Sequence, residues 1–265
     1  MDIQNKKVFH IIDVHCHLEQ KDYDKDRDKV VEECRKAGLK AIITSCARPG
    51  DFDLTMQMVE KHNGFVFATC GIHPEFIKEI KPAEADDFLE RIKENRDRIA
   101  GIGEVGLDYA WVKEPEWRRK QAELFAQLIG FAKELKKPLV IHSRDAYEDS
   151  LKILEQEDAG RAVMHMFGAN HLVKRVIENG YSVSLNAIVL RSKKHRKVAR
   201  DMPLERMMLE TDAPWLHPEG KGRNDPRAIK VVAEKIAEIK RLEFSEVWEQ
   251  CAKNAIEFFN LPVKI

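Results

Sequence analysis

Two histidines near the N-terminus, His15 and His17, have a spacing that suggests metal chemistry. They follow an apolar run and are separated only by Cys16. Side chains on an extended strand alternate between its two faces, so both imidazoles are expected on one face, together with Asp13. Neutral imidazole is the commonest metal ligand in proteins. The pair therefore predicts a metal site at the carboxyl end of a strand, with two unrelated polar side chains there as the alternative.

Four later residues that can bind metal follow apolar runs in the same way. They are Glu104, His142, His165 and Asp212. In a parallel barrel the carboxyl ends of all strands meet at one rim, so the six side chains would converge there. Four imidazoles and two carboxylates suit Zn²⁺, Mn²⁺, Ni²⁺ or Co²⁺, and also Mg²⁺ with more help from water.

The size of this ligand set predicts two divalent metal ions. Six ligands are too many for one tetrahedral ion but fit two ions that share a carboxylate. Two ions about 3.5–4 Å apart lower the pKa of a water molecule between them and stabilise attacking and leaving oxygens. Glu104, on a middle strand, is placed to bridge the ions. Asp212 is placed to hold the attacking water and accept its proton, which makes both residues catalytic candidates.

Eight short β-rich runs alternate with amphipathic helical stretches and supply the strands that these residues follow. The runs cover residues 8–15, 40–47, 65–71, 99–106, 138–142, 161–165, 181–186 and 207–211. This order predicts a single α/β domain over residues 1–265, a (β/α)8 TIM barrel whose strands are buried on both faces. A doubly wound open sheet is the alternative. Ser245 is expected to cap the last helix, which extends to Phe259.

Length and charge narrow the class of protein. The chain has 265 residues, and its 45 basic and 45 acidic residues give a formal net charge of zero. This balance argues against a globally basic nucleic-acid binder but allows a local basic patch. No apolar stretch approaches a membrane span, and the N-terminus lacks a signal-peptide pattern. We therefore expect a soluble, cytoplasmic protein that contacts no membrane.

Five short motifs in order resemble the successive signatures of the TatD family. They are 13–18 (DVHCHL), 71–74 (GIHP), 102–109 (IGEVGLDY), 141–146 (IHSRDA) and 210–214 (ETDAP). With 223–226 (RNDP), they extend over almost the whole chain. The family is a branch of the amidohydrolase-like barrels, in which related enzymes often use a carboxylated lysine as the bridge. The glutamate at position 104 indicates the TatD branch.

The resemblance implies a metal-dependent deoxyribonuclease, some members of the family having 3′–5′ exonuclease activity. It implies one metal held by His15, His17, Glu104 and Asp212, and another held by Glu104, His142 and His165. The chain departs from the family pattern at 110–111 (AW), 165–169 (HMFGA) and 223–226 (RNDP). None of these departures removes a metal ligand, but together they leave the choice of substrate open.

Four residues are candidates for binding substrate. His73 follows the third run and could contact a scissile phosphate or protonate a leaving oxygen; the alternative is a histidine held by the turn at Pro74. Arg144 and Arg223 could bind phosphate through charge-assisted hydrogen bonds, or form surface ion pairs instead. Asn224 could orient the loop or the substrate, a role that only the resemblance implies.

The strongest basic run covers residues 191–200 and follows the seventh predicted strand, so its start should approach the rim. A nucleic-acid backbone would be attracted to it. Such runs are usually solvated helix faces, and no aromatic residue interleaves with this one, so we favour that interpretation. Trp111 and Trp215 could offer stacking surfaces near the rim.

Three functions are compatible with these patterns. The first is a two-metal phosphodiesterase with DNA as substrate and no obligate protein partner. The second uses the same metals on a lactone, an amide, a phosphotriester or an ester such as aminoacyl-tRNA, because metal ligands do not discriminate between these bonds. The third is a binding protein without catalytic activity, against which the complete ligand set argues.

Overall fold

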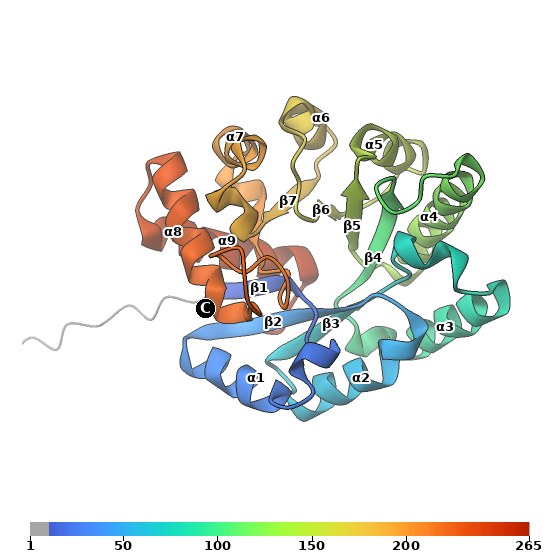
Figure 1. Cartoon of the computed structure of the whole chain (residues 1–265), viewed down its shortest axis with the longest axis horizontal. Helices are drawn as coiled ribbons and strands as arrows, with labels where there is room; N and C mark the ends of the chain where they lie inside the picture. Colours follow the sequence, from blue (N-terminus) through green and yellow to red (C-terminus); the bar gives the residue numbers. More distant parts are fainter. Residues whose placement is uncertain (1–10, 265) are drawn as a thin grey trace, which may run out of the picture.

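The computed structural model describes residues 11–264. Its central sheet has eight parallel strands, and helices surround the sheet (Figure 1). The strands are β1 (Ile11–Cys16), β2 (Leu39–Cys46), β3 (Val66–Cys70), β4 (Gly101–Asp108), β5 (Leu139–Arg144), β6 (Ala162–Met164), β7 (Ser182–Leu185) and β8 (Met207–Leu209). They are hydrogen-bonded in chain order from β1 to β8. The sequence prediction of a (β/α)8 barrel is confirmed, and the open-sheet alternative is wrong.

The barrel closes between its first and last strands, just beyond the end of β8. There the amide of Asp212 donates to the carbonyl of His15 at 2.9 Å, and the amide of His17 donates to the carbonyl of Ala213 at 2.7 Å. Closure therefore joins the backbone of both N-terminal histidines to the segment that carries Asp212.

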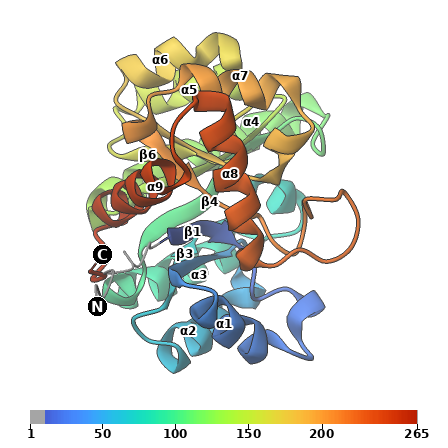
Figure 2. The same ribbon diagram turned by 90° about the vertical axis from the view of Figure 1, so that its left-hand side faces the viewer.

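Helices follow the strands and cover the outside of the barrel (Figure 2). They are α1 (Arg27–Lys36), α2 (Phe52–Lys61), α3 (Pro82–Glu94), α4 (Pro115–Leu135), α5 (Tyr147–Gln156), α6 (Val173–Glu178), α7 (Lys193–Asp201), α8 (Ile229–Lys240) and α9 (Phe244–Phe259). The prediction that Ser245 caps the last helix is wrong. The extended residue before α9 is Glu243, so Ser245 lies in its first turn. No helix within residues 11–264 combines the length and the apolar character of a transmembrane span.

The predicted strands all exist, and their ends differ from the predicted ones by at most two residues where the structure describes them. Residues 8–10 of the first predicted run lie outside the described residues. β4 extends two residues beyond its predicted end, to Asp108, and β8 stops two residues early, at Leu209. β6 ends at Met164, so His165 lies just after its strand instead of ending it, whereas Asp212 follows the eighth strand as predicted.

A buried apolar cluster lies on the same strand faces as the metal-ligand candidates. Val140 and Val163 belong to it, together with Phe259 from the end of α9. His142 and His165 each come two residues after one of these valines, and a spacing of two keeps side chains on the same face of a strand. The cluster thus supports the imidazoles from below.

Two glycines let β4 and β5 approach closely. A Cβ atom at Gly103 would lie 2.6 Å from the Cβ of Val140, and one at Gly106 would lie 2.0 Å from the carbonyl oxygen of His142. Gly106 also has φ +140°, which other residues rarely adopt. This approach places Glu104 on β4 beside His142 on β5.

Candidate metal centre

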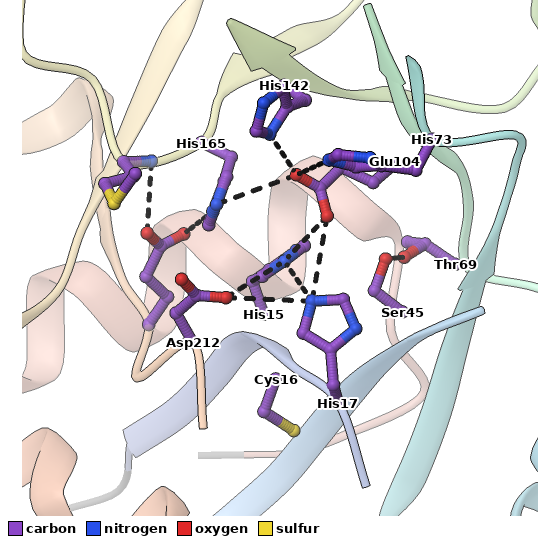
Figure 3. A network of polar contacts seen from close by, with 12 residues as sticks. His15, Cys16, His17, Ser45, Thr69, His73, Glu104, His142, His165 and Asp212 are labelled. Atoms are coloured by element: carbon purple, nitrogen blue, oxygen red, sulfur yellow. Dashed lines mark hydrogen bonds and ion pairs between the residues drawn. The ribbon is translucent and has the colours of Figure 1, made fainter. Parts of the chain in front are cut away.

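The six predicted metal ligands converge at the carboxyl end of the barrel (Figure 3). Their side chains come from β1, β4 and β5 and from the segments after β1, β6 and β8. All six residues are at least nine-tenths buried. Five of them line a cavity of about 780 Å³: His17, Glu104, His142, His165 and Asp212.

The first group of ligand atoms surrounds one oxygen of Glu104. The Nε2 atoms of His15 and His17 are 3.1 Å apart. Oε2 of Glu104 lies 3.3 Å and 3.7 Å from these two nitrogens, respectively. Oδ1 of Asp212 lies 3.7 Å from Nε2 of His15 and 3.6 Å from Nε2 of His17. These four atoms face a common point.

The second group surrounds the other oxygen of Glu104. Its Oε1 atom lies 2.6 Å from Nδ1 of His142 and 3.8 Å from Nε2 of His165. Nε2 of His73 lies 3.5 Å from the same oxygen. Glu104 therefore stands between two sets of imidazoles and presents one carboxylate oxygen to each set.

The spacing of these donors fits divalent metal ions. Metal–nitrogen and metal–oxygen bonds of about 2.0–2.2 Å separate adjacent ligand atoms by about 3.0–3.5 Å. The first group has separations of 3.1–3.7 Å, which a small adjustment would bring into this range. Lone pairs that face one another at such distances need a shared positive charge, so the residues present fit a bound cation.

Buried carboxylates orient three of the imidazoles by accepting a hydrogen bond from the nitrogen turned away from Glu104 or Asp212. Glu19 Oε1 lies 3.0 Å from Nδ1 of His17, and Glu210 Oε2 lies 2.9 Å from Nδ1 of His165. Asp108 Oδ2 lies 3.0 Å from Nε2 of His142. Metal-binding histidines typically have such a partner, because it fixes the tautomer and raises ligand basicity.

Sequence reasoning did not single out these three carboxylates. Glu19 continues the alternation of His15 and His17, so the period of two could have revealed it. Asp108 and Glu210 lie inside the motifs, but their sequence positions do not show which imidazole each contacts. Glu210 is also held in place, since it accepts hydrogen bonds from Ser184 and from Nδ2 of Asn186.

The histidines and carboxylates of this cluster stabilise each other's charged forms, so the imidazoles tend to be protonated and Glu104 ionised. Burial opposes the charge on Glu104, but the surrounding histidines, with His73 foremost, hold the pKa of Glu104 well below its usual range. Burial lowers the pKa of His17, yet Glu19, Glu104 and Asp212 together outweigh it and raise that pKa to about 9. The carboxylates beside His142 and His165 likewise overcome burial and raise their pKa values to about 9 and about 10. Protons thus supply the positive charge that a metal would bring.

Asp212 differs from Glu104 in its ionisation. Burial raises the pKa of Asp212 above its usual value, against the opposing effect of His165 and His15. Its backbone has φ +56°, a left-handed conformation that is uncommon outside glycine, asparagine and aspartate. The hydrogen bond from its amide to His15 holds that backbone. A carboxylate of raised pKa at the cavity edge is suited to accept a proton.

When neutral, His73 turns a protonated nitrogen toward the cavity, unlike His17, His142 and His165. Its Nδ1 accepts a hydrogen bond from the amide of Glu75 at 3.2 Å. The neutral ring therefore carries its proton on Nε2, which points toward Glu104. A protonated Nε2 cannot bind metal, so His73 is placed as a hydrogen-bond donor to a ligand in the cavity.

The three other predicted substrate-binding residues lie in different surroundings. Arg144 is exposed, lines the cavity, and has its guanidinium 5.7 Å from the ring centre of Trp111. The guanidinium of Arg223 forms two hydrogen bonds of 2.7 Å with Asp26. Asn224 is buried and donates to the carbonyl of Thr211 at 3.1 Å, next to Asp212. Contact of these residues with substrate stays a prediction.

Comparison with known proteins identifies relatives along nearly the whole chain. The family model described as TatD related DNase matches residues 12–260. Human deoxyribonuclease TATDN3 is 33% identical over 258 residues, which are 94% of this chain and 94% of the relative. MJ1582 of Methanocaldococcus jannaschii, named an uncharacterized metal-dependent hydrolase, is 34% identical over 94% of this chain and 96% of its own length.

Solved structures show the same fold. YJJV, a TatD homolog from Escherichia coli, superposes with a TM-score of 0.89 at 24% identity, covering 96% of this chain and 100% of that one. A TatD family hydrolase of Entamoeba histolytica gives a TM-score of 0.86 at 21% identity, covering 94% and 97% of the two chains. The match to the family model and to these relatives shows that the chain is a metal-dependent hydrolase and belongs to the TatD related DNase family.

Proposed function

We propose that this protein is a two-metal phosphodiesterase that hydrolyses DNA. The observation that carries the proposal is the position of Glu104, whose two carboxylate oxygens face two separate sets of imidazoles. One divalent cation would be held by His15, His17, Glu104 and Asp212, and a second by Glu104, His142 and His165. When bound, the cations would lower the pKa of the attacking water and stabilise negative charge at the phosphate.

Asp212 orients the attacking water and accepts its proton. Its carboxylate lies at the edge of the cavity, within 3.7 Å of Nε2 of both His15 and His17. The raised pKa of Asp212 brings its basicity closer to neutral pH, where a general base is most effective. Asn224 acts as a positioning residue, since its amide fixes the backbone just before Asp212.

Three side chains, those of His73, Arg144 and Lys194, bind the scissile phosphate. The Nε2–H of His73 donates to a phosphate oxygen or to the leaving oxygen. Arg144 and Lys194 line the same cavity and have no ion pair within residues 11–264. Positively charged side chains without a carboxylate partner are available to bind phosphate, to which arginine can donate two parallel hydrogen bonds. Arg223 acts less directly, because Asp26 already occupies its guanidinium.

The test uses purified, metal-stripped protein with added Mg²⁺, Mn²⁺, Zn²⁺, Ni²⁺ or Co²⁺. Oligonucleotides labelled at the 5′ or the 3′ end report cleavage and its direction, and we expect stepwise shortening from the 3′ end. A parallel panel of lactones, amides, phosphotriesters and carboxylic esters tests the alternative substrates. Turnover of one of these with no cleavage of DNA would overturn the proposal.

The bridging role of Glu104 is tested by Glu104→Ala. We expect loss of at least a thousandfold in kcat with an unchanged circular dichroism spectrum, because the carboxylate shared by both cations is removed. Glu123→Ala on the exposed face of α4 is the control, with its side chain 64% exposed. Full activity of Glu104→Ala would exclude the bridge.

A further inference from the structure

Trp215 lies between two depressions, the cavity of about 780 Å³ at the proposed metal centre (the central cavity) and a second hollow. The indole is 47% exposed, which is high for tryptophan, and it lines both depressions. Its ring centre lies 4.7 Å from that of His17. A large flat surface is thus presented to solvent directly beside the proposed metal centre.

The loop that carries Trp215 is fixed by backbone hydrogen bonds. The amide of Trp215 donates to the carbonyl of Asp212 at 3.0 Å, and the amide of Asn224 donates to the carbonyl of Pro214 at 2.9 Å. The indole is therefore preorganised, so a ligand that stacks on it loses less free energy to ordering.

The second hollow has a volume of about 450 Å³ and positively charged walls. Arg191, Lys221, Arg223 and one carboxylate, Asp22, line it. Asp26 neutralises Arg223. Neither Arg191 nor Lys221 has an ion pair within the part of the chain that the structure describes.

Arg191 is also oriented by its surroundings. Its Nη1 donates to the carbonyls of His217 and Pro218, both at 3.3 Å, while the side chain stays exposed. Arg191 opens the basic run 191–200, and Lys194 from the same run lines the central cavity. The start of the run therefore contributes one cation to each depression.

An exposed aromatic face between two sets of unpaired cations fits an unpaired segment of nucleic acid. Bases stack on aromatic side chains, and the phosphates between them are attracted to arginine and lysine. We propose that the substrate strand leaves the central cavity across Trp215, with one base stacked on the indole and the next phosphates bound by Arg191 and Lys221. This path rests on the proposed function, because it extends the strand from the metal centre.

Binding tests the path without relying on catalysis. Fluorescence anisotropy measures the Kd of a fluorescein-labelled deoxythymidine decamer for the metal-free protein. For Arg191→Ala/Lys221→Ala we expect the Kd to rise at least tenfold. The slope of log Kd against log salt should fall by about 1.4, which corresponds to two lost phosphate contacts. Lys152→Ala/Arg241→Ala removes two exposed positive charges elsewhere and is the matched control.

Trp215 is tested by Trp215→Ala and Trp215→Phe. Loss of stacking should raise the Kd of the decamer about fivefold or more in Trp215→Ala, with recovery of most of the affinity in Trp215→Phe. Bound metal, measured by mass spectrometry after dialysis, should be equal in both variants and in the wild type. An equal Kd in Trp215→Ala and the wild type would overturn the stacking role.

Activity separates this path from the proposed function. The second substrate is the p-nitrophenyl ester of thymidine 5′-monophosphate, which is too short to reach the second hollow. We expect the ratio of kcat/KM for the decamer to that for the ester to fall at least tenfold in Arg191→Ala/Lys221→Ala. A wild-type ratio in this variant, or an equal effect of the control variant, would overturn the path while cleavage by the wild type upholds the nuclease. A wild type that cleaves neither substrate would overturn the proposed function.

Discussion

At the scale of single residues, hydrogen-bond partners decide what each imidazole can do. Carboxylates hold the outer nitrogens of His17, His142 and His165, so the inner nitrogens present lone pairs once the rings are deprotonated. The amide of Glu75 has the opposite effect on His73, because it makes the inner nitrogen of that ring the protonated one. Four similar side chains in one cavity therefore divide into three proposed metal ligands and one proposed hydrogen-bond donor.

The partner of His142 provides a direct test of this division. Asp108→Asn replaces the acceptor with an amide and removes the negative charge that raises the basicity of His142. We expect metal affinity to fall about 10- to 100-fold, as is typical for such outer partners. Isothermal titration with Zn²⁺ or Co²⁺ measures it. Asp145→Asn is the control, because Asp145 lines the same cavity and forms no hydrogen bond or ion pair with a proposed ligand within residues 11–264. An equal loss of metal affinity in that variant would contradict a specific role of Asp108.

Proton release on metal binding follows from the raised pKa values of His17, His142 and His165. These lie at about 9, 9 and 10, so all three rings are protonated at pH 7 in the metal-free protein. Each must lose its proton to bind a cation. We expect release of two to three protons per chain at pH 7 and weaker metal binding as the pH falls. Calorimetry in buffers of different ionisation enthalpy counts these protons. Metal binding without proton release would contradict the proposal that these three protonated histidines are the metal ligands.

At the scale of elements, the sequence predicts what depends on periodicity and misses what depends on distant contacts. The alternation of His15 and His17, and the position of ligands just after apolar runs, placed all six candidates on one rim. Strand ends differed because hydrogen bonds to neighbouring strands decide them. The pairing of Arg223 with Asp26 joins segments 197 residues apart, and no local pattern reveals such a contact.

The close approach of β4 and β5 predicts a strong effect of Gly106→Ala. The added methyl group would meet the carbonyl oxygen of His142 at 2.0 Å, and alanine is strained at φ +140°. We expect a loss of at least about 2 kcal/mol in the free energy of unfolding, measured by urea denaturation, together with weaker metal binding. Gly130→Ala on α4 has open space around its Cβ position and should be neutral or stabilising. Equal stability of the two variants would contradict this packing argument.

At the scale of the whole molecule, the proposed ligands join strands from both ends of the chain. His15 and His17 come from the first strand and Asp212 from the segment after the last, where the barrel closes. A cation bound between them would therefore stabilise the closed barrel as a unit. The free energy of that stabilisation depends only on ligand concentration and affinity when the unfolded chain does not bind.

Metal addition should consequently raise the melting temperature. At free metal about 100-fold above Kd, one site contributes about 2.7 kcal/mol. For a chain of this size that corresponds to an increase of about 5–10 °C in Tm. Differential scanning calorimetry with and without a chelator measures it. An increase of the same size in Glu104→Ala would show that the metal stabilises the protein elsewhere.

The increase in Tm should also depend on pH. In the metal-free protein the raised pKa values of His17, His142 and His165 mean that protonated rings favour folding. This contribution is fully present below the unfolded value of about 6.5 and is lost as pH rises through about 9–10. The difference in Tm between metal-loaded and metal-free protein should therefore widen from pH 6.5 to pH 10. A difference in Tm that stays constant from pH 6.5 to pH 10 would contradict the predicted pH dependence.

The meeting of the first strand with the segment after the last has a consequence during synthesis. A ribosome that has produced two hundred residues has already released both N-terminal histidines, but Asp212 does not yet exist. The proposed ligand set of the growing polypeptide therefore stays incomplete until Asp212 has left the ribosome, late in translation.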